Sequence, residues 1–173
     1  GINPVFLRGK LDGVDARDFD DAVWAEADSD PDNPGGWHIL VAIADVAHYV
    51  RHGDALDEDA RERGNSVYFP DRVVPMLPEA LSNGLCSLRP DEDRACLAVH
   101  LYLSAEGEIR RHRFVRGLMR SGARLNYGQF QKALDGHPDD DLKPLIETVV
   151  KPLHGAYLAL AAARRKRGTL ELE

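Results

Sequence analysis

The order of the apolar patterns predicts an α+β fold with a mixed, largely antiparallel β-sheet core and flanking helices. Three observations support this class. Apolar segments of strand length come early in the chain, a hairpin pattern follows them, and helical spacing dominates the C-terminal part. The chain has 173 residues, 43% of them hydrophobic and 29% charged. Such a composition is typical of one globular domain and not of a disordered or fibrous protein.

Two strands are predicted near the N-terminus, at residues 22–26 and 37–44. The second is a nearly continuous apolar run, which is typical of a strand buried on both faces. Residues 27–36 separate the two strands and contain two prolines and two glycines. This composition predicts a surface loop.

A short charged helix is predicted over residues 55–63. Asp54 can cap its N-terminus, and Gly64 is placed to end it. Segment 65–90 alternates apolar pieces with four prolines. That pattern predicts an extended, wall-like connection with one helical turn after Pro78.

The C-terminal half begins with a predicted hairpin. Residues 95–104 alternate with a period of two, and a second strand begins at Ile109 after a short polar turn. Asn126 is placed to start a helix that ends near Gly136. Residues 141–167 carry apolar side chains at helical spacing, with bends expected at their two prolines.

Several classes of protein are disfavoured. The longest strongly apolar run, Ile39 to Ala44, is far shorter than the roughly 20 residues needed to cross a bilayer, and we expect no secretion signal. Cys86 and Cys96 have no CxxC spacing and lie among apolar residues. Buried thiols in a reducing compartment are therefore expected, and the protein is predicted to be cytoplasmic.

Charge is distributed unevenly along the chain, whose formal net charge is −7. Residues 1–108 hold 22 acidic and 9 basic residues, whereas residues 109–173 hold 7 acidic and 13 basic ones. This asymmetry favours two partners of opposite sign, such as metal cations near one end and a polyanion near the other. Scattered solvated charge is the alternative.

A dense acidic cluster lies between residues 12 and 21. Five of these ten positions are aspartates: Asp12, Asp15, Asp18, Asp20 and Asp21. Carboxylates this close repel one another unless cations neutralise them, and Mg²⁺ or Mn²⁺ prefers oxygen ligands. The cluster is consistent with metal-assisted phosphoryl hydrolysis, in which two ions hold a phosphodiester in line. An EF-hand is disfavoured because the required glycine and glutamate positions do not match. An acidic solvated turn remains open as the alternative.

Three segments in one order resemble the catalytic domain of the ribonuclease II and ribonuclease R family. They are Leu11-Asp-Gly-Val-Asp-Ala-Arg-Asp-Phe-Asp-Asp-Ala22, His38-Ile-Leu-Val-Ala-Ile-Ala-Asp-Val-Ala-His-Tyr-Val50 and the run from Arg63 to Leu88 that contains Ser66-Val-Tyr-Phe-Pro70. The third segment is most similar to the ribonuclease R branch. The resemblance runs from about residue 6 to the end of the chain.

This resemblance implies a hydrolytic, processive 3′-to-5′ exoribonuclease that uses Mg²⁺, with Mn²⁺ as a substitute, and releases nucleoside 5′-monophosphates. It implies catalytic roles for Asp20 and Asp18, and it implies metal binding by Asp12, Asp18, Asp20 and Asp21. The partner would be the 3′ end of single-stranded RNA, with Tyr68 stacking on a base. An interior aromatic is the alternative for Tyr68.

The family's catalytic domain is about twice as long and is flanked by cold-shock and S1 domains, which have no counterpart in this sequence. We therefore expect residues 1–173 to be the N-terminal portion of one such domain, inactive alone. Its exposed apolar surface would contact the missing remainder or form oligomers. Two alternatives stay open: a non-catalytic RNA-binding or regulatory module that keeps the fold, and a calcium-stabilised structural domain.

Weaker signals lie elsewhere in the chain. Six arginines between residues 110 and 124 could contact phosphates. His48 and His52 have helical spacing but lack the further ligands of a zinc site. Asp45 follows a predicted buried strand, where it could join a site or cap the next turn. The basic residues 164–167 are expected to lie in the last turns of a helix, where cations suit the helix dipole.

Overall fold

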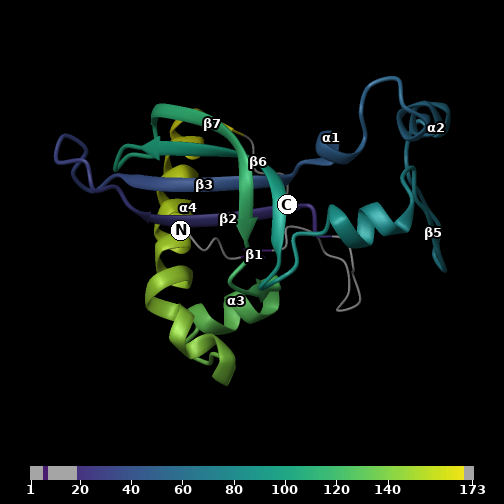
Figure 1. The fold of residues 1–173 in the computed structure, drawn as a ribbon. Helices are drawn as coiled ribbons and strands as arrows, with labels where there is room; N and C mark the ends of the chain where they lie inside the picture. Colours follow the sequence, from purple (N-terminus) through teal and green to yellow (C-terminus); the bar gives the residue numbers. More distant parts are fainter. Residues whose placement is uncertain (1–5, 8–18, 170–173) are drawn as a thin grey trace.

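The computed structural model describes residues 6–7 and 19–169. A four-stranded antiparallel sheet in the order β2-β3-β6-β7 forms its centre (Figure 1). The strands are β2 (Asp21–Ala27), β3 (Trp37–Ala44), β6 (Asp93–Leu103) and β7 (Ile109–Arg120). Two small sheets accompany it: β1 (Phe6–Leu7) pairs in parallel with β8 (Arg124–Leu125), and β4 (Val67–Tyr68) pairs antiparallel with β5 (Val73–Val74). The predicted α+β class, with its largely antiparallel sheet, is confirmed.

Helical segments flank the sheet. They are α1 (Val46–Tyr49), α2 (Ala55–Arg63), a π-helical turn η1 (Ala80–Leu85), α3 (Tyr127–Leu134), a 3₁₀ segment η2 (Asp140–Leu145), a second π-helical turn η3 (Ile146–Val150) and α4 (Lys151–Lys166). The helix predicted over residues 141–167 is thus a series of three helical pieces. Pro144 lies inside the 3₁₀ segment and Pro152 in the first turn of α4, where each is tolerated.

Side-chain capping defines two of the predicted helices. The Asp54 carboxylate accepts the backbone N–H of Asp57 at 2.8 Å, and Gly64 closes α2 with a φ of +76°. The Asn126 side chain likewise accepts from the backbone of Gln129, whose own side chain accepts from the backbone N–H of Asn126. These bonds satisfy backbone donors that a helix leaves unpaired at its start.

The segment between α2 and β6 differs from the prediction of an extended connection. It contains the β4–β5 hairpin, which is stabilised by a hydrogen bond from the N–H of Phe69 to the carbonyl of Arg72, at 2.8 Å. The Ser66 hydroxyl also accepts the N–H of Met76 at 3.0 Å. Strands of two residues are too short to produce a periodic signal in the sequence. The helical turn expected after Pro78 is present as η1.

The sheet has a hydrophobic cluster on each face. On one face, buried residues of the strands such as Leu40 and Ala98 pack with Leu81 of η1 and with Leu88, which follows η1. The other face is covered at one end by the helical C-terminal part, with residues such as Val149 and Leu153. Strand β3 lies inside the sheet and is buried over most of its length, as predicted. Its Ile43 is the exception, 54% exposed beyond the covered end.

Both cysteines are buried and neither forms a disulfide within the described residues, in agreement with the prediction of buried thiols. Burial, aided by the nearby Asp45 carboxylate, raises the pKa of the Cys96 thiol. Within residues 6–7 and 19–169, no helix combines the length and apolarity needed to span a membrane.

We expect Gly107→Ala to destabilise the fold by about 2–5 kcal/mol. Gly107 turns the chain between β6 and β7 with a φ of +78°, and a Cβ there would lie 2.1 Å from the carbonyl oxygen of Ala159 in α4. The substitution would therefore combine an unfavourable backbone conformation with a clash against a helix. Urea unfolding provides the measurement. Gly64→Ala is the matched control, since its φ is +76° and nothing lies within 4 Å of its added Cβ. Equal losses in the two variants would show that Gly107 has no packing role.

Candidate functional site

The described part of the acidic motif lies at one edge of the central sheet. At this edge β2 begins, β3 ends, β6 begins and β7 ends. The carbonyl of Asp20 accepts the N–H of Ala44 at 2.8 Å, and the carbonyl of Phe19 accepts the N–H of Leu88 at 2.7 Å. The backbone that carries the acids is thus held by β3 on one side and by the chain that follows η1 on the other.

Asp20 and Asp21 are both exposed at this edge. Ala22, the next residue, is only 2% exposed and packs in the core. Because successive side chains in an extended chain point to opposite faces, Asp21 lies on the opposite side from Asp20 and Ala22. The two carboxylates therefore reach solvent from adjacent positions on a rigid strand end.

The predicted metal ligands are only partly within the described residues. Asp12 and Asp18 lie outside them. In the part of the chain that the structure describes, no three His, Cys, Asp or Glu side chains are grouped so that they could hold a metal ion. Asp20 and Asp21 nevertheless fit Mg²⁺ chemically. This ion is usually bound through one or two carboxylates and completes its shell with waters and substrate phosphates.

Asp45 belongs to the same edge and is paired with Arg116. It is 7% exposed at the end of β3, and its Oδ1 accepts Nη2 of Arg116 at 2.8 Å while its Oδ2 accepts Nε. Hydrogen bonding to this guanidinium lowers the pKa of the Asp45 carboxyl below its usual range. Asp45 occupies the N-cap position of α1, but its side chain makes no capping hydrogen bond. Asp45 therefore occupies the capping position that the sequence allows, while its carboxylate is engaged chiefly by Arg116.

We expect Arg116→Gln to lower Tm at pH 7, because it leaves the buried Asp45 carboxylate without its partner. The folded-state pKa of Asp45 lies below the unfolded value of about 3.9. The contribution of the pair is therefore fully present above about pH 5 and is lost as the pH falls through the folded-state pKa. Thermal unfolding measured from neutral to acidic pH should show the Tm of Arg116→Gln converging on that of the parent chain. Arg113→Gln, on the same strand, is the control; a Tm difference that stays constant with pH would contradict this role.

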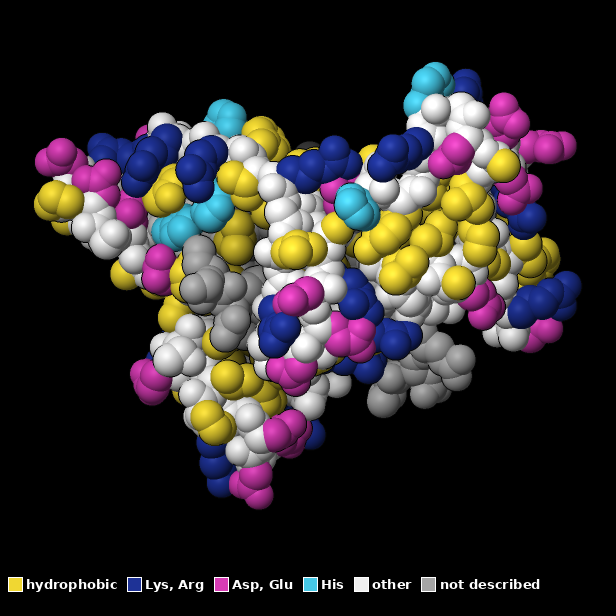
Figure 2. All heavy atoms as spheres, viewed as in Figure 1, with side chains coloured by type: hydrophobic (Ala, Val, Ile, Leu, Met, Phe, Trp, Pro, Cys, Tyr) yellow, Lys and Arg dark blue, Asp and Glu magenta, His cyan; other side chains and the backbone are white. Residues whose placement is uncertain are grey.

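Tyr68 projects from the β4–β5 hairpin and is 70% exposed. The alternative of an interior aromatic is therefore wrong. Its neighbours Val67, Phe69 and Val73 are also between 43% and 49% exposed. Hydrophobic side chains gather on this part of the molecule, between the sheet and β5 (Figure 2). A two-stranded hairpin with such a surface is typical of an element that contacts a ligand or another part of a protein.

The arginines between residues 110 and 124 bind mostly to the chain itself. Their partners are the carbonyl of Asp32 for Arg110, the Tyr102 ring for Arg111, Asp45 for Arg116, Asp93 for Arg120 and the Phe19 ring for Arg124. Most of these arginines therefore stabilise loops and strand ends through contacts within the chain. The Arg124 guanidinium lies 4.4 Å from the centroid of Phe19 and so packs directly against the acidic motif. Residues 164–166 lie in the last turn of α4, as predicted.

Sequence comparison assigns the chain to a family. The family model described as RNB domain matches residues 10–173, which include the acidic motif and every element from β2 onward. The chain belongs to the RNB domain family. The resemblance predicted from three motifs is confirmed.

This RNB chain is similar to proteins named Ribonuclease R. It is 48% identical over 166 residues to that of Vibrio parahaemolyticus, covering 94% of this chain and 19% of the relative. The corresponding values for Escherichia coli are 47%, 94% and 20%. The RNB chain thus spans about a fifth of the length of the curated relatives it matches.

The fold is also similar to that of solved structures of Mycoplasma genitalium RNase R. The complex with double-stranded RNA has a TM-score of 0.87 and 31% identity, covering 99% of this chain and 29% of that one. The complex with ribose-methylated single-stranded RNA has a TM-score of 0.86 and 31% identity, covering 99% and 26%. The likeness therefore extends over essentially the whole RNB chain.

Proposed function

We propose that this RNB chain carries the metal-binding acids of a hydrolytic 3′-to-5′ exoribonuclease. The enzyme would act processively on the 3′ end of single-stranded RNA and release nucleoside 5′-monophosphates. The match of the RNB domain family over residues 10–173, with the aspartate motif inside it, carries this proposal. The exposed position of Asp20 and Asp21 on a fixed strand end supports it. Two buried cysteines that form no disulfide in the described part of the chain are consistent with the cytoplasmic location that we also propose.

The proposed division of labour follows the acidic motif. Asp12, Asp18, Asp20 and Asp21 would hold Mg²⁺, or Mn²⁺ in its place, and Asp18 and Asp20 would also take part in the chemistry. The bound ions would supply the positive charge that activates water and stabilises the charge developing on the phosphate. Hydrogen bonds from Ala44 and Leu88 fix the backbone of Phe19 and Asp20, so the Asp20 carboxylate would need little backbone rearrangement on substrate binding.

We further propose that residues 1–173 are the N-terminal portion of one catalytic domain and need the rest of it for full activity. The relatives are about five times as long as the part matched here. One end of a sheet face carries uncovered apolar side chains, with Ile43 54%, Leu97 48% and Leu118 76% exposed. In the sheet register Ile43 lies directly opposite Leu97. We propose that the remainder of the domain, or a second copy of the chain, covers this surface.

A chimeric enzyme tests the proposed function. The matching segment of the Vibrio parahaemolyticus Ribonuclease R is replaced by this chain, and degradation of 5′-labelled single-stranded RNA is followed on gels with chromatography of the products. We expect progressive shortening from the 3′ end, with nucleoside 5′-monophosphates as products. A chimera that binds RNA without degrading it would instead support the non-catalytic module. Digestion by the 173-residue chain alone at the rate of the chimera would contradict its proposed dependence on the rest of the domain.

We expect Tyr68→Ala in this chimera to change the length of the final oligonucleotide, because loss of the ring removes a base-stacking contact of about 1–3 kcal/mol. Tyr68→Phe keeps the ring and is the control. Gel electrophoresis of limit digests measures the end product. An unchanged end product for Tyr68→Ala would show that the exposed ring does not hold the RNA end.

A further inference from the structure

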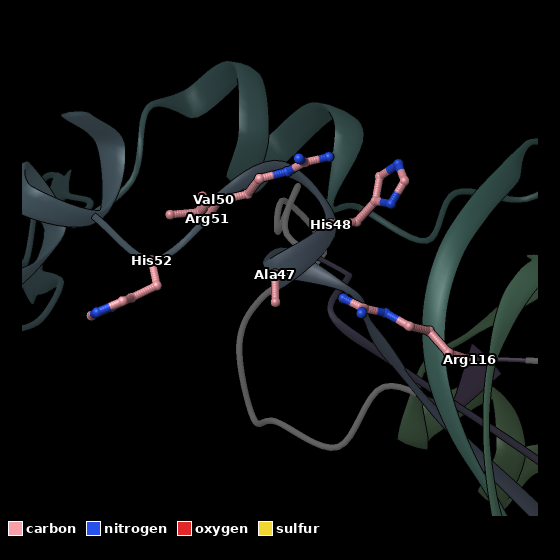
Figure 3. Close-up of a pocket in the computed structure, with 6 residues that line it drawn as sticks. All are labelled: Ala47, His48, Val50, Arg51, His52 and Arg116. Atoms are coloured by element: carbon pink, nitrogen blue, oxygen red, sulfur yellow. The ribbon is translucent and has the colours of Figure 1, made fainter. Parts of the chain in front are cut away.

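A basic pocket lies beside the acidic edge of the sheet, between β7 and the chain that runs from α1 toward α2 (Figure 3). It has a volume of about 470 Å³ and is lined by Ala47, His48, Val50, Arg51, His52 and Arg116. Four of these six residues have basic side chains and none is acidic. The pocket therefore has the chemistry of an anion site.

The sheet register places Arg116 of this pocket on the face of the sheet that carries Asp21, which is opposite to the face of Asp20. Asp21 lies opposite Ile43, Ile43 opposite Leu97, and Leu97 opposite Arg116. Residues directly opposite one another on neighbouring strands share a face. Three strand spacings of about 4.8 Å separate the Cα atoms of Asp21 and Arg116 by about 14 Å. A few nucleotides of extended RNA can span that separation if they run between this face and the remainder of the domain that is proposed to cover Ile43 and Leu97.

Arg116 is held in place before any ligand arrives. Its Nε and Nη2 bind the buried Asp45 carboxylate, which leaves Nη1 outside that pair. Figure 3 shows its guanidinium extending from β7 toward Ala47 and His48 on α1. A guanidinium fixed in this way loses little conformational entropy when it binds a phosphate oxygen.

The acidic groups around the pocket are engaged by other partners. Asp54 accepts the backbone N–H of Arg51 at 2.8 Å and also caps α2. Asp57 accepts the N–H of Gly53 at 2.9 Å and lies 3.4 Å from the ring of His52. Asp54 and Asp57 are thus hydrogen-bonded to backbone amides, and Asp45 is paired with Arg116.

We propose that this pocket binds a backbone phosphate of the RNA strand whose scissile bond lies at the acidic motif. The inference rests on the proposed function, which identifies RNA as the ligand. Arginine and histidine side chains contact phosphate oxygens without reading the base, so the pocket would position the strand independently of its sequence. None of its residues belongs to the predicted catalytic set.

Binding without cleavage tests the pocket by itself. The 173-residue chain is titrated into a fluorescein-labelled oligouridylate in EDTA, and anisotropy gives Kd between about 50 and 200 mM KCl. We expect Arg51→Gln to weaken binding roughly fivefold at the lowest salt and to reduce the salt slope by about 0.7, the value for one phosphate contact on a single strand. Arg63→Gln is the matched control because Arg63 pairs with Asp59 on α2, outside the pocket, and the substitution removes the same charge. Arg116 is left intact so that Asp45 keeps its partner.

Histidine ring resonances give a second readout that needs no variant. RNA should shift the nitrogen resonances of His48 in a heteronuclear NMR titration, while those of His137, which lies beyond α3, stay unchanged. Inorganic phosphate and adenosine 5′-monophosphate, added at the same phosphate concentration, should produce smaller shifts than RNA.

The proposal would be overturned by equal Kd values and salt slopes for Arg51→Gln and Arg63→Gln, by His48 resonances that do not respond, or by a wild-type chain that binds no RNA. His48 shifts as large with inorganic phosphate as with RNA would also overturn it in favour of a free-phosphate site. None of these results affects the metal chemistry proposed for Asp20, which is measured by cleavage in the chimera. If the chimera failed to cleave RNA while Arg51→Gln still weakened RNA binding, the proposed function would be disproved and RNA binding by the pocket would not.

Discussion

Asp20→Asn should lower kcat of the chimeric enzyme by about 10²–10³-fold while Kd for RNA changes by less than about threefold. Asparagine has nearly the size of aspartate but carries no negative charge. Because the carbonyl of Asp20 is bonded to the N–H of Ala44, the strand end should keep its position in the variant. The substitution thus removes one carboxylate and leaves the backbone support intact.

Asp15→Asn is the matched control for this measurement. It makes the same chemical change inside the same motif, at an aspartate to which we assign no catalytic or metal-binding role. We expect kcat of the control to stay within a few-fold of the parent. If Asp20→Asn instead abolished RNA binding, or if both variants lost activity equally, Asp20 would have to be assigned a structural role.

Removing divalent metal should reduce RNA degradation by the chimera to background. Excess EDTA would strip the ions from the acidic motif, whose carboxylates then repel one another and can no longer hold an activated water. Mg²⁺ or Mn²⁺ should restore the activity, and Ca²⁺ should not, because it prefers more ligands and a looser geometry. Single-turnover assays at saturating enzyme separate this effect from RNA binding.

Calorimetry with each ion separates the remaining alternatives. A calcium-stabilised structural domain predicts that Ca²⁺ raises Tm more than Mg²⁺ or Mn²⁺ and that RNA has no effect. Full activity in EDTA would contradict the proposed metal dependence directly.

The sequence predicts the parts of the fold that have strong local signals. The β3 strand follows from its apolar run, and α2 follows from Asp54 at one end and Gly64 at the other. Helix α1 and the β4–β5 hairpin were not predicted because four-residue and two-residue elements carry too little periodicity. The bent series from η2 to α4 is intermediate, since its prolines mark bends but do not fix the helix type.

The sequence likewise indicates some residues of the candidate site and not others. Asp20, Asp21 and Tyr68 are candidates from the sequence alone because they belong to short contiguous motifs, and their roles stay predictions. The pairing of Asp45 with Arg116 could not be predicted, because 71 residues separate them and three aligned strands bring them together. The basic pocket depends on that pairing as well. It combines Arg116 of β7 with residues after β3, and their basic side chains look like ordinary surface charge in the sequence.

Anomalous scattering from manganese tests the central claim most directly. Crystals of the chimera with single-stranded RNA bound would be soaked in Mn²⁺ and measured near the manganese absorption edge. We expect an anomalous peak within ligand distance of the carboxylate oxygens of Asp20 or Asp21 and of an RNA phosphate oxygen. RNA bound at the acidic motif with no anomalous peak there would contradict the account.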